Sequence, residues 1–193
     1  MIQFRHGVFE TNSSSSHSII ISTQGDYYTK EEIERSVRYD NDEGLIYFWT
    51  DELEFYRYPF DILSSFGAKL RYVIASYGWN QEIPEEVYDI CREVIDGFKG
   101  FHFPRAMSWD DEDEEKEYHG DIDHQSESLL KSFLKKYDVT LREFLLNKKY
   151  VVIIDGDEID VTDRLLNLSF VDNDRIDKFF GIYGELERVN DSD

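Results

Sequence analysis

The segment Tyr150-Val151-Val152-Ile153-Ile154 is the strongest strand signal in this chain of 193 residues. β-Branched and aromatic residues favour strands, and a short continuous apolar run is typical of a strand that is buried on both faces. Asp155-Gly156 follows directly, and this dipeptide is a strong turn signal. The pattern predicts a β-hairpin between this strand and Glu158–Val161.

A second strand pair is predicted at the other end of the chain. Phe4–Phe9 and Ser18–Ser22 have the composition of short strands, and a polar run separates them. This run reads Thr11-Asn12-Ser13-Ser14-Ser15-Ser16-His17. A linker would keep such a run away from strand-forming neighbours, so we expect an ordered connection in a tight β-unit.

Helices are predicted between the two strand pairs. Thr29-Lys30-Glu31-Glu32 has the pattern of a capping box and predicts a helix to about Val37. Pro59 and Pro84 are each expected to begin a further helix, the first of them extending to about Tyr77. The remaining predicted elements are strands at Leu45–Thr50 and Phe101–Phe103 and helices at Gln125–Tyr137 and Thr140–Leu146. Strands at both ends with helices between them predict an α+β fold, with an N-terminal β-unit, central helices and a C-terminal β-hairpin.

Composition limits the class of protein. The length predicts a single domain over residues 1–193, and 40% apolar and 16% aromatic residues are enough to form a core. The net charge of −21 argues against direct binding to nucleic acid or an anionic membrane, because Lys and Arg supply most of the affinity for phosphates. A partner with a basic surface is compatible with this charge.

The compartment is predicted from two further features. Cys91 is the single cysteine, so no internal disulfide can form, and its spacing with Val87 and Ile90 predicts a buried apolar position on a helix. The opening residues lack the apolar core of a signal peptide, and no apolar run approaches the ~20 residues that cross a bilayer. We therefore expect a cytosolic protein.

The Ser-rich run is the first candidate site. Asn12, the four hydroxyls Ser13, Ser14, Ser15 and Ser16, and His17 could bind an anion, or His17 could activate one serine as a nucleophile. Neither interpretation has its usual support, because no glycine or helix start follows and residues so close in sequence seldom face each other. The structural alternative is a loop whose hydroxyls bond to its own backbone.

A His/Asp cluster is the second candidate. His119, Asp121, Asp123 and His124 are ligand types for zinc or manganese, and the first three would share one face of an extended segment. The alternative is a solvated acidic loop in which Asp123 or Ser126 caps the next helix. Asp155-Gly156-Asp157-Glu158 is a weaker candidate for magnesium, for which a turn is the favoured interpretation.

An acidic tract precedes the His/Asp cluster. Residues 110–127 contain ten acidic residues and one Lys, a net charge of −9. We expect an exposed loop over residues 109–124, either without function or serving as an interaction surface. The residues assigned to that surface are Asp110, Asp111, Glu112, Asp113, Glu114 and Glu115.

Two segments carry a resemblance to known proteins. The opening Arg5-His6-Gly7-Val8-Phe9-Glu10-Thr11-Asn12-Ser13-Ser14-Ser15-Ser16-His17-Ser18 resembles the start of a family of bacteriophage and prophage proteins. A weaker similarity covers Phe144–Tyr150 and Ile153–Glu158. The resemblance implies a phage or mobile-element origin and a bacterial cytoplasm, and it transfers no activity.

Two functions follow as hypotheses. The first is a phage-type cytosolic protein that binds a host protein with a basic surface and inhibits or modulates defence or nucleic-acid processing, without a cofactor. The alternative is a metal-dependent hydrolase or nucleotide-handling enzyme, in which the Ser-rich run binds phosphate and the His/Asp cluster holds a divalent ion. The enzyme requires these two segments to converge around a pocket. The sequence predicts neither an oligomeric state nor the identity of the partner.

Overall fold

The structure is a computed structural model, and it describes residues 16–22, 25–55, 61–78, 82–107, 115–122, 128–155 and 186–190. Its helices are α1 (Lys30–Ser36), α2 (Phe66–Ala75), α3 (Glu85–Val94), α4 (Leu129–Tyr137) and α5 (Leu141–Leu146), with a 3₁₀ turn η1 (Thr50–Glu52). Its strands are β1 (Ser16–Ser22), β2 (Tyr39–Asp40), β3 (Leu45–Tyr47), β4 (Glu54–Phe55), β5 (Asp61–Leu63), β6 (Gly100–His102), β7 (Arg105–Met107), β8 (Glu115–Glu117), β9 (Asp121–Ile122), β10 (Tyr150–Asp155) and β11 (Leu186–Asn190). This combination of helices and several small sheets confirms the predicted α+β class.

The largest sheet contains the strand predicted most strongly from sequence. Its order is β11-β1-β10-β5, and every neighbouring pair is antiparallel. β10 is an inner strand, and its apolar residues Val151–Ile154 are all buried, as expected for a strand covered on both faces. The predicted hairpin partner of β10, Glu158–Val161, and the predicted first strand, Phe4–Phe9, lie outside the described residues.

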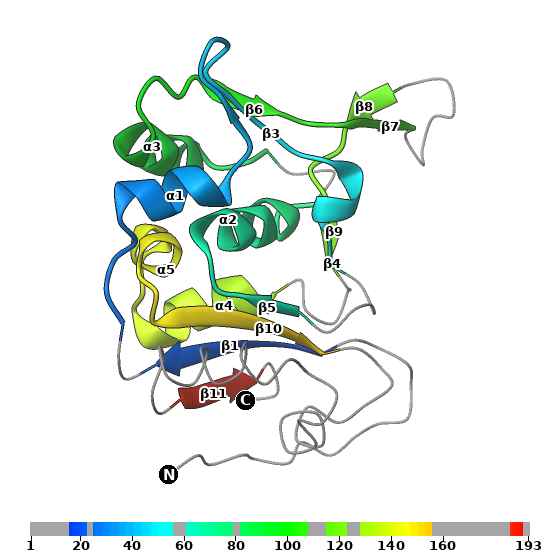
Figure 1. The fold of residues 1–193 in the computed structure, drawn as a ribbon. Coiled ribbons are helices and arrows are strands. Elements are labelled where there is room, and N and C mark those ends of the chain that lie inside the picture. The colour runs from blue at the N-terminus through cyan, green and yellow to red at the C-terminus, as the bar shows by residue number, and fades with distance from the viewer. Residues whose placement is uncertain are drawn as a thin grey trace, which may run out of the picture.

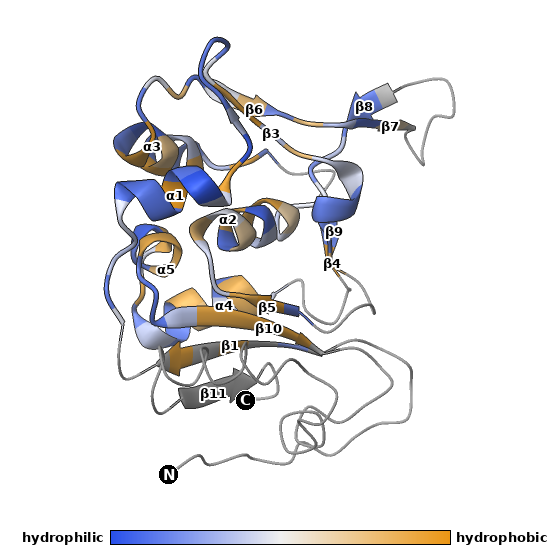
Figure 2. Cartoon of the chain, in the orientation of Figure 1, coloured by the Kyte–Doolittle hydropathy of each residue, from blue (hydrophilic) through white to orange (hydrophobic). Residues whose placement is uncertain are grey.

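The helices lie between this sheet and a smaller sheet of order β2-β3-β6, in which β3 and β6 are parallel (Figure 1). Two short ribbons, β4 with β9 and β7 with β8, complete the described strands. In Figure 2, β10, β1, α4 and α5 are mostly hydrophobic, whereas α1 and the turn between β2 and β3 are mostly hydrophilic. None of the described helices combines the length and apolar character needed to cross a membrane.

Helix α2 is the centre of the core. Every residue of α2 except Arg71 is buried, including Lys69. Ser65 caps its first turn by accepting a hydrogen bond from Ala68 N, and Ser36 Oγ accepts one from Gly67 N. The prediction that this helix begins at Pro59 is wrong, because Asp61–Leu63 form β5 beside β10 and the serine at residue 65 supplies the cap.

The other predicted helices are found with small changes in their bounds. Thr29 forms the expected capping box with Glu32, and α1 ends at Ser36. Pro84 precedes α3 directly, and Gly97 follows it with a φ of +77°, which favours glycine. The predicted strand Leu45–Thr50 is shorter than expected, because η1 begins at Thr50.

Candidate functional site

The Ser-rich run is described only at its end. Asn12–Ser15 lie outside the described residues, and β1 begins at Ser16, two residues earlier than predicted. His17 is 3% exposed, and its Nδ1 lies 3.2 Å from the hydroxyl of Tyr72 on α2. The structure therefore places Ser16 and His17 in a strand and the imidazole in the core, which corrects the predicted loop at these two positions. A binding role for the preceding serines stays a prediction.

The His/Asp cluster is also described in part. His119 is largely buried beside the ring of Phe103, with ring centroids 4.5 Å apart, and its Nε2 lies 3.6 Å from Glu117. Asp121 belongs to β9 and pairs in register with Glu54. Asp123 and His124 lie outside the described residues. Within the part of the chain that the structure describes, no three His, Cys, Asp or Glu side chains gather closely enough to hold a metal ion.

A chain of aromatic contacts connects the described ends of these two segments. The ring of His17 lies 5.7 Å from that of Tyr72, which meets Phe55 edge-on at 5.3 Å. Phe55 belongs to β4 and pairs with Ile122, the neighbour of Asp121. The contacts on this path are those of a packed core, so the described parts of the two segments share no pocket.

Two other predicted regions are described only at their edges. Asp110–Glu114 lie outside the described residues, whereas Glu115 belongs to β8 and pairs with Met107 in the β7–β8 ribbon. Asp155 is the last residue of β10 and pairs with Ser16. Asp157 and Glu158 lie outside the described residues, so the magnesium interpretation and its turn alternative stay predictions.

Cys91 lies where the sequence predicted it, on the buried face of α3. Burial disfavours the thiolate and raises the pKa of Cys91 to about 12. A thiol with this pKa is a poor nucleophile at neutral pH, so its role is to fill the core.

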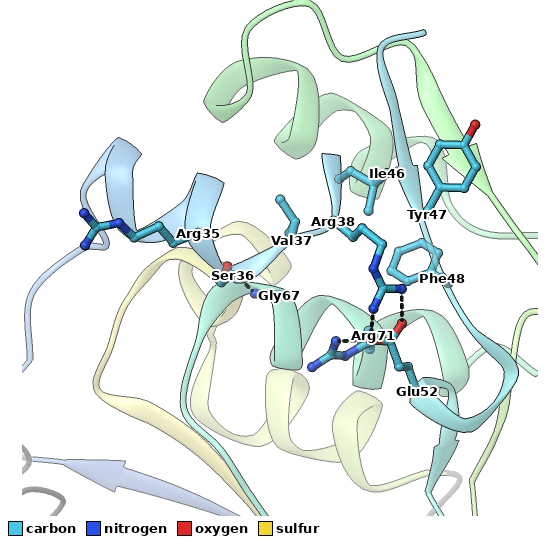
Figure 3. Close-up of a pocket in the computed structure, with 10 residues that line it drawn as sticks. All are labelled: Arg35, Ser36, Val37, Arg38, Ile46, Tyr47, Phe48, Glu52, Gly67 and Arg71. Carbon is cyan, nitrogen blue, oxygen red and sulfur yellow. Dashed lines mark hydrogen bonds and ion pairs between the residues drawn. The ribbon is translucent and has the colours of Figure 1, made fainter. Parts of the chain in front are cut away.

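No sequence pattern indicated the cleft that lies between the end of α1, β3, η1 and α2. Its volume is about 320 Å³, and its lining includes Arg38, Glu52 and Arg71 together with Val37 and Phe48 (Figure 3). The backbones of α1 and α2 pack closely beside this cleft. A Cβ on Gly67 would lie only 1.9 Å from the carbonyl oxygen of Ser36, so only glycine allows this approach.

One carboxylate in this cleft serves two arginines. Arg38 Nη1 and Nη2 each donate to Glu52 at 3.2 Å in a forked arrangement, and Arg71 Nη1 donates to Glu52 Oε1 at 3.2 Å (Figure 3). Glu52 is oriented by the backbone N–H of Trp49, which donates to Oε2 at 3.0 Å. Two positive charges and one negative charge leave a net charge of +1 in a chain whose net charge is −21.

Trp49 lies beside this cleft. It is 59% exposed, and the guanidinium of Arg38 lies over its ring, 5.1 Å from the centroid. Cation–π stacking holds both side chains in place. An aromatic ring with this exposure is available to a planar ligand group.

Lys69 is a second cation that sequence reasoning did not select. Its side chain is 0% exposed, and Nζ donates to the carbonyl oxygens of Phe144 at 2.7 Å and Asn147 at 2.8 Å. These acceptors belong to the last turn of α5 and its C-cap, which helical hydrogen bonds leave unpaired. Burial lowers the pKa of Lys69 well below its ordinary value.

A sequence signal for Lys69 existed, whereas one for the cleft did not. Lys69 lies three residues after Phe66 and four before Val73, on the apolar face of α2, a position where a cation requires a buried partner. Arg38, Glu52 and Arg71 are separated by 14 and 19 residues and follow no spacing rule. Only the packing of α2 against the β2–β3 region brings them together.

Comparison of this chain with protein-family models, with curated proteins and with solved structures found no match. The functional conclusion therefore depends on the residues and their arrangement.

Proposed function

We propose that this chain is a binding protein of bacteriophage type that acts in the bacterial cytoplasm on a host protein with a basic surface. Binding would inhibit or modulate a factor of host defence or nucleic-acid processing. The proposal is supported by the net charge of −21 and by the resemblance of residues 5–18 to phage and prophage proteins.

The observation that carries the proposal is a group of exposed carboxylates, here called the acidic edge. It consists of Glu34, Asp40, Asp42, Glu43 and Asp96. Three segments contribute to it, namely α1, β2 with the turn after it, and the loop after α3.

Several contacts hold these segments side by side. Lys30 of α1 forms ion pairs with Glu34 at 3.9 Å and with Asp96. Tyr39 Oη donates to the carbonyl oxygen of Asp96 at 2.9 Å, and Lys99 N donates to that of Gly44 at 2.7 Å. The turn itself is fixed by Asp40 Oδ1, which accepts hydrogen bonds from the backbone N–H groups of Asp42 at 2.8 Å and Glu43 at 2.9 Å.

The charge balance of the acidic edge favours a basic partner. Five carboxylates face two ammonium groups, those of Lys30 and Lys99, so the net charge is −3. Like-charged groups held close together gain free energy when cations of a partner neutralise them, and the field of the whole chain steers such a partner toward it.

The test compares two variants with the same net charge. The edge variant carries Asp42→Asn, Glu43→Gln and Asp96→Asn, and the control carries Asp61→Asn, Glu82→Gln and Glu86→Gln at exposed positions elsewhere. Immobilised wild-type protein should retain a basic host protein from a bacterial lysate, in an amount that falls as salt rises. The edge variant should lose that protein and the control should keep it.

Equal retention by the edge variant and the control would contradict the acidic edge as the binding surface. Retention of no basic protein by the wild type would contradict the proposed function itself.

A further inference from the structure

We propose that the cleft of Arg38, Glu52 and Arg71 is a binding site for a phosphate monoester. This site is separate from the acidic edge, and it would take a small molecule rather than a protein. Three features of the cleft support the proposal, namely its hydrogen-bond donors, its charge and its volume.

The arginines have donors left after their internal contacts. A guanidinium has five N–H groups in a planar fork. Arg71 uses one of them on Glu52, and within the described residues the structure shows no other acceptor for its remaining donors. The side chain of Arg71 is 29% exposed, so these donors reach the cleft.

The ratio of charges distinguishes this site from the other described ion pairs of arginine. Arg92 pairs with both Glu85 and Asp89, and Arg142 has Glu93 to itself. In the cleft the ratio is reversed, because Arg38 and Arg71 share the carboxylate of Glu52. The pair is therefore undercompensated, which favours a ligand that brings more negative charge than the single carboxylate of Glu52.

The geometry of Glu52 indicates which anion the site accepts. The donors of both arginines converge on its two oxygens, so this carboxylate occupies a position that is already arranged for an oxyanion. A phosphate monoester has three terminal oxygens and a charge of about −1.5 to −2 at neutral pH. When Glu52 rotates aside, a phosphate monoester can therefore neutralise the charges of both guanidinium groups. A monocarboxylate carries one negative charge and can neutralise only one of them.

The size of the cleft limits the ligand. A volume of about 320 Å³ is at the lower end of the range for small-molecule sites, which begins at about 300 Å³. The net charge of −21 repels polyanions at long range, but the charges beyond about 8–10 Å are largely screened at physiological salt. A single phosphate group therefore interacts mainly with the net charge of +1 in the cleft, whereas a nucleic-acid backbone would also extend within this distance of surrounding carboxylates.

The ligand class has two sources, a sugar phosphate or a nucleotide. Trp49 can distinguish these two ligands. Its exposed ring beside Arg38 can stack on the base of a nucleotide, whereas contact with a sugar adds little binding energy. Isothermal titration of the full chain with AMP, ribose 5-phosphate and adenosine distinguishes these sources. We expect saturable binding of both phosphates and none of adenosine. If AMP binds more tightly than ribose 5-phosphate and Trp49→Ala abolishes this difference, the ligand is a nucleotide. If the two affinities are equal in the wild type, the site accepts phosphate monoesters in general.

Variants test the residues. Arg38→Gln and Arg71→Gln should each weaken phosphate binding about tenfold or more, because each removes charge-assisted hydrogen bonds to the oxyanion. Arg92→Gln is the control, since it removes an arginine of similar exposure from an ion-pair group on α3. Glu52→Gln should strengthen binding about threefold to tenfold, because the competing carboxylate is gone. This gain keeps the test valid if an arginine variant does not fold.

Three results from the wild type and the arginine variants would overturn the proposal. They are the absence of saturable binding for both AMP and ribose 5-phosphate, binding of adenosine as tight as that of AMP, and weakening by Arg92→Gln equal to that by Arg71→Gln. Weaker binding by the folded Glu52→Gln variant would equally refute it.

Discussion

Lys69 and Arg71 are two cations on the same helix, two residues apart, and they serve opposite purposes. Lys69 is fully buried, and its ammonium group donates to two carbonyl oxygens at the end of α5. Arg71 is the one residue of α2 that is not buried, and it shares a carboxylate with Arg38 in an open cleft. Side chains two apart on a helix project about 200° apart, so one cation faces the core and the other faces solvent.

The comparison shows how location determines the energetic role of a charge. A buried cation is expensive to desolvate, so it is retained only where fixed acceptors surround it. An ion pair open to solvent contributes little stability, and although the Arg71–Glu52 pair is part-buried, it lines an open cleft, so we expect its arrangement to serve binding more than stability. We therefore expect substitutions on the Lys69 side to change stability and those on the Arg71 side to change binding.

The largest effect should come from Gly67, which brings α2 against the end of α1. In Gly67→Ala the new Cβ would lie 1.9 Å from Ser36 O, so the backbones must separate and the cleft must change shape. We expect a loss of about 3 kcal/mol in the free energy of unfolding. Thermal unfolding measures this loss, because 1 kcal/mol corresponds to about 2–4 °C for a domain of this size.

Gly100→Ala is the matched control for Gly67→Ala. Its Cβ would meet only Leu45 Cδ2 at 3.7 Å, an ordinary van der Waals contact. An equal fall in Tm for both variants would show that close packing at Gly67 is not the cause.

The second effect belongs to Lys69 and depends on pH. Since the pKa of Lys69 is lowered on folding, the unfolded chain binds more protons between the folded pKa and the ordinary value near 10.5. Stability conferred by this residue therefore rises with pH across that interval and falls as pH is lowered. A neutral amine still has two N–H groups for its two carbonyl acceptors.

Lys69→Met keeps the volume and removes both donors. We expect it to cost about 2 kcal/mol near pH 9 and less at pH 6, because the buried carbonyl of Phe144 loses the donor Nζ and that of Asn147 keeps only the 3.4 Å bond from Tyr150 N. Urea unfolding of the wild type and the variant across this pH range gives the difference. A difference that is the same at every pH would contradict a lowered pKa in the folded protein.

A smaller effect is expected in the cleft. Glu52→Gln removes the carboxylate that Arg38 and Arg71 share, and we expect its free energy of unfolding to change by less than about 1 kcal/mol. Thermal unfolding at low and high salt measures this change. A loss as large as that of Lys69→Met would show that the cleft ion pairs hold the fold together, and the contrast between the two faces of α2 would not stand.

The smallest effect is expected at the acidic edge. The carboxylate of Asp96 is largely exposed and pairs with Lys30 at the surface, where water and salt screen the interaction. Asp96→Asn should leave Tm unchanged within error in calorimetry. A clear fall in Tm would mean that the acidic edge stabilises the fold and is not only a surface for binding.

Several elements could be predicted because their signals are local. The run Tyr150–Ile154 has the composition of a buried strand, and Thr29 and Glu32 form a capping box three residues apart. Helix α2 was placed correctly at its end but not at its start, since Pro59 and Ser65 are both acceptable starting signals. Pairing of β5 with β10, a contact between distant segments, selects Ser65.

The candidate sites also divide into those with local sequence signals and those that depend on contacts between distant segments. Cys91 was correctly assigned to the core, because its helical spacing with Val87 and Ile90 is visible in the sequence. His17 was assigned to a loop because its neighbours are serines, whereas the structure extends β1 through it and buries the imidazole against Tyr72. Strand pairing with Ile154 decided its environment, and that partner is more than 100 residues away.

The sequence alone determined the α+β class, the main helices and the acidic character, because composition, periodicity and capping act over a few residues. Tertiary structure alone decided that Lys69 reaches the carbonyls of α5 and that Arg38, Glu52 and Arg71 form one cleft. The reason is physical: desolvation and charge pairing depend on distances between elements, which are set when α2 packs between the two sheets (Figure 1).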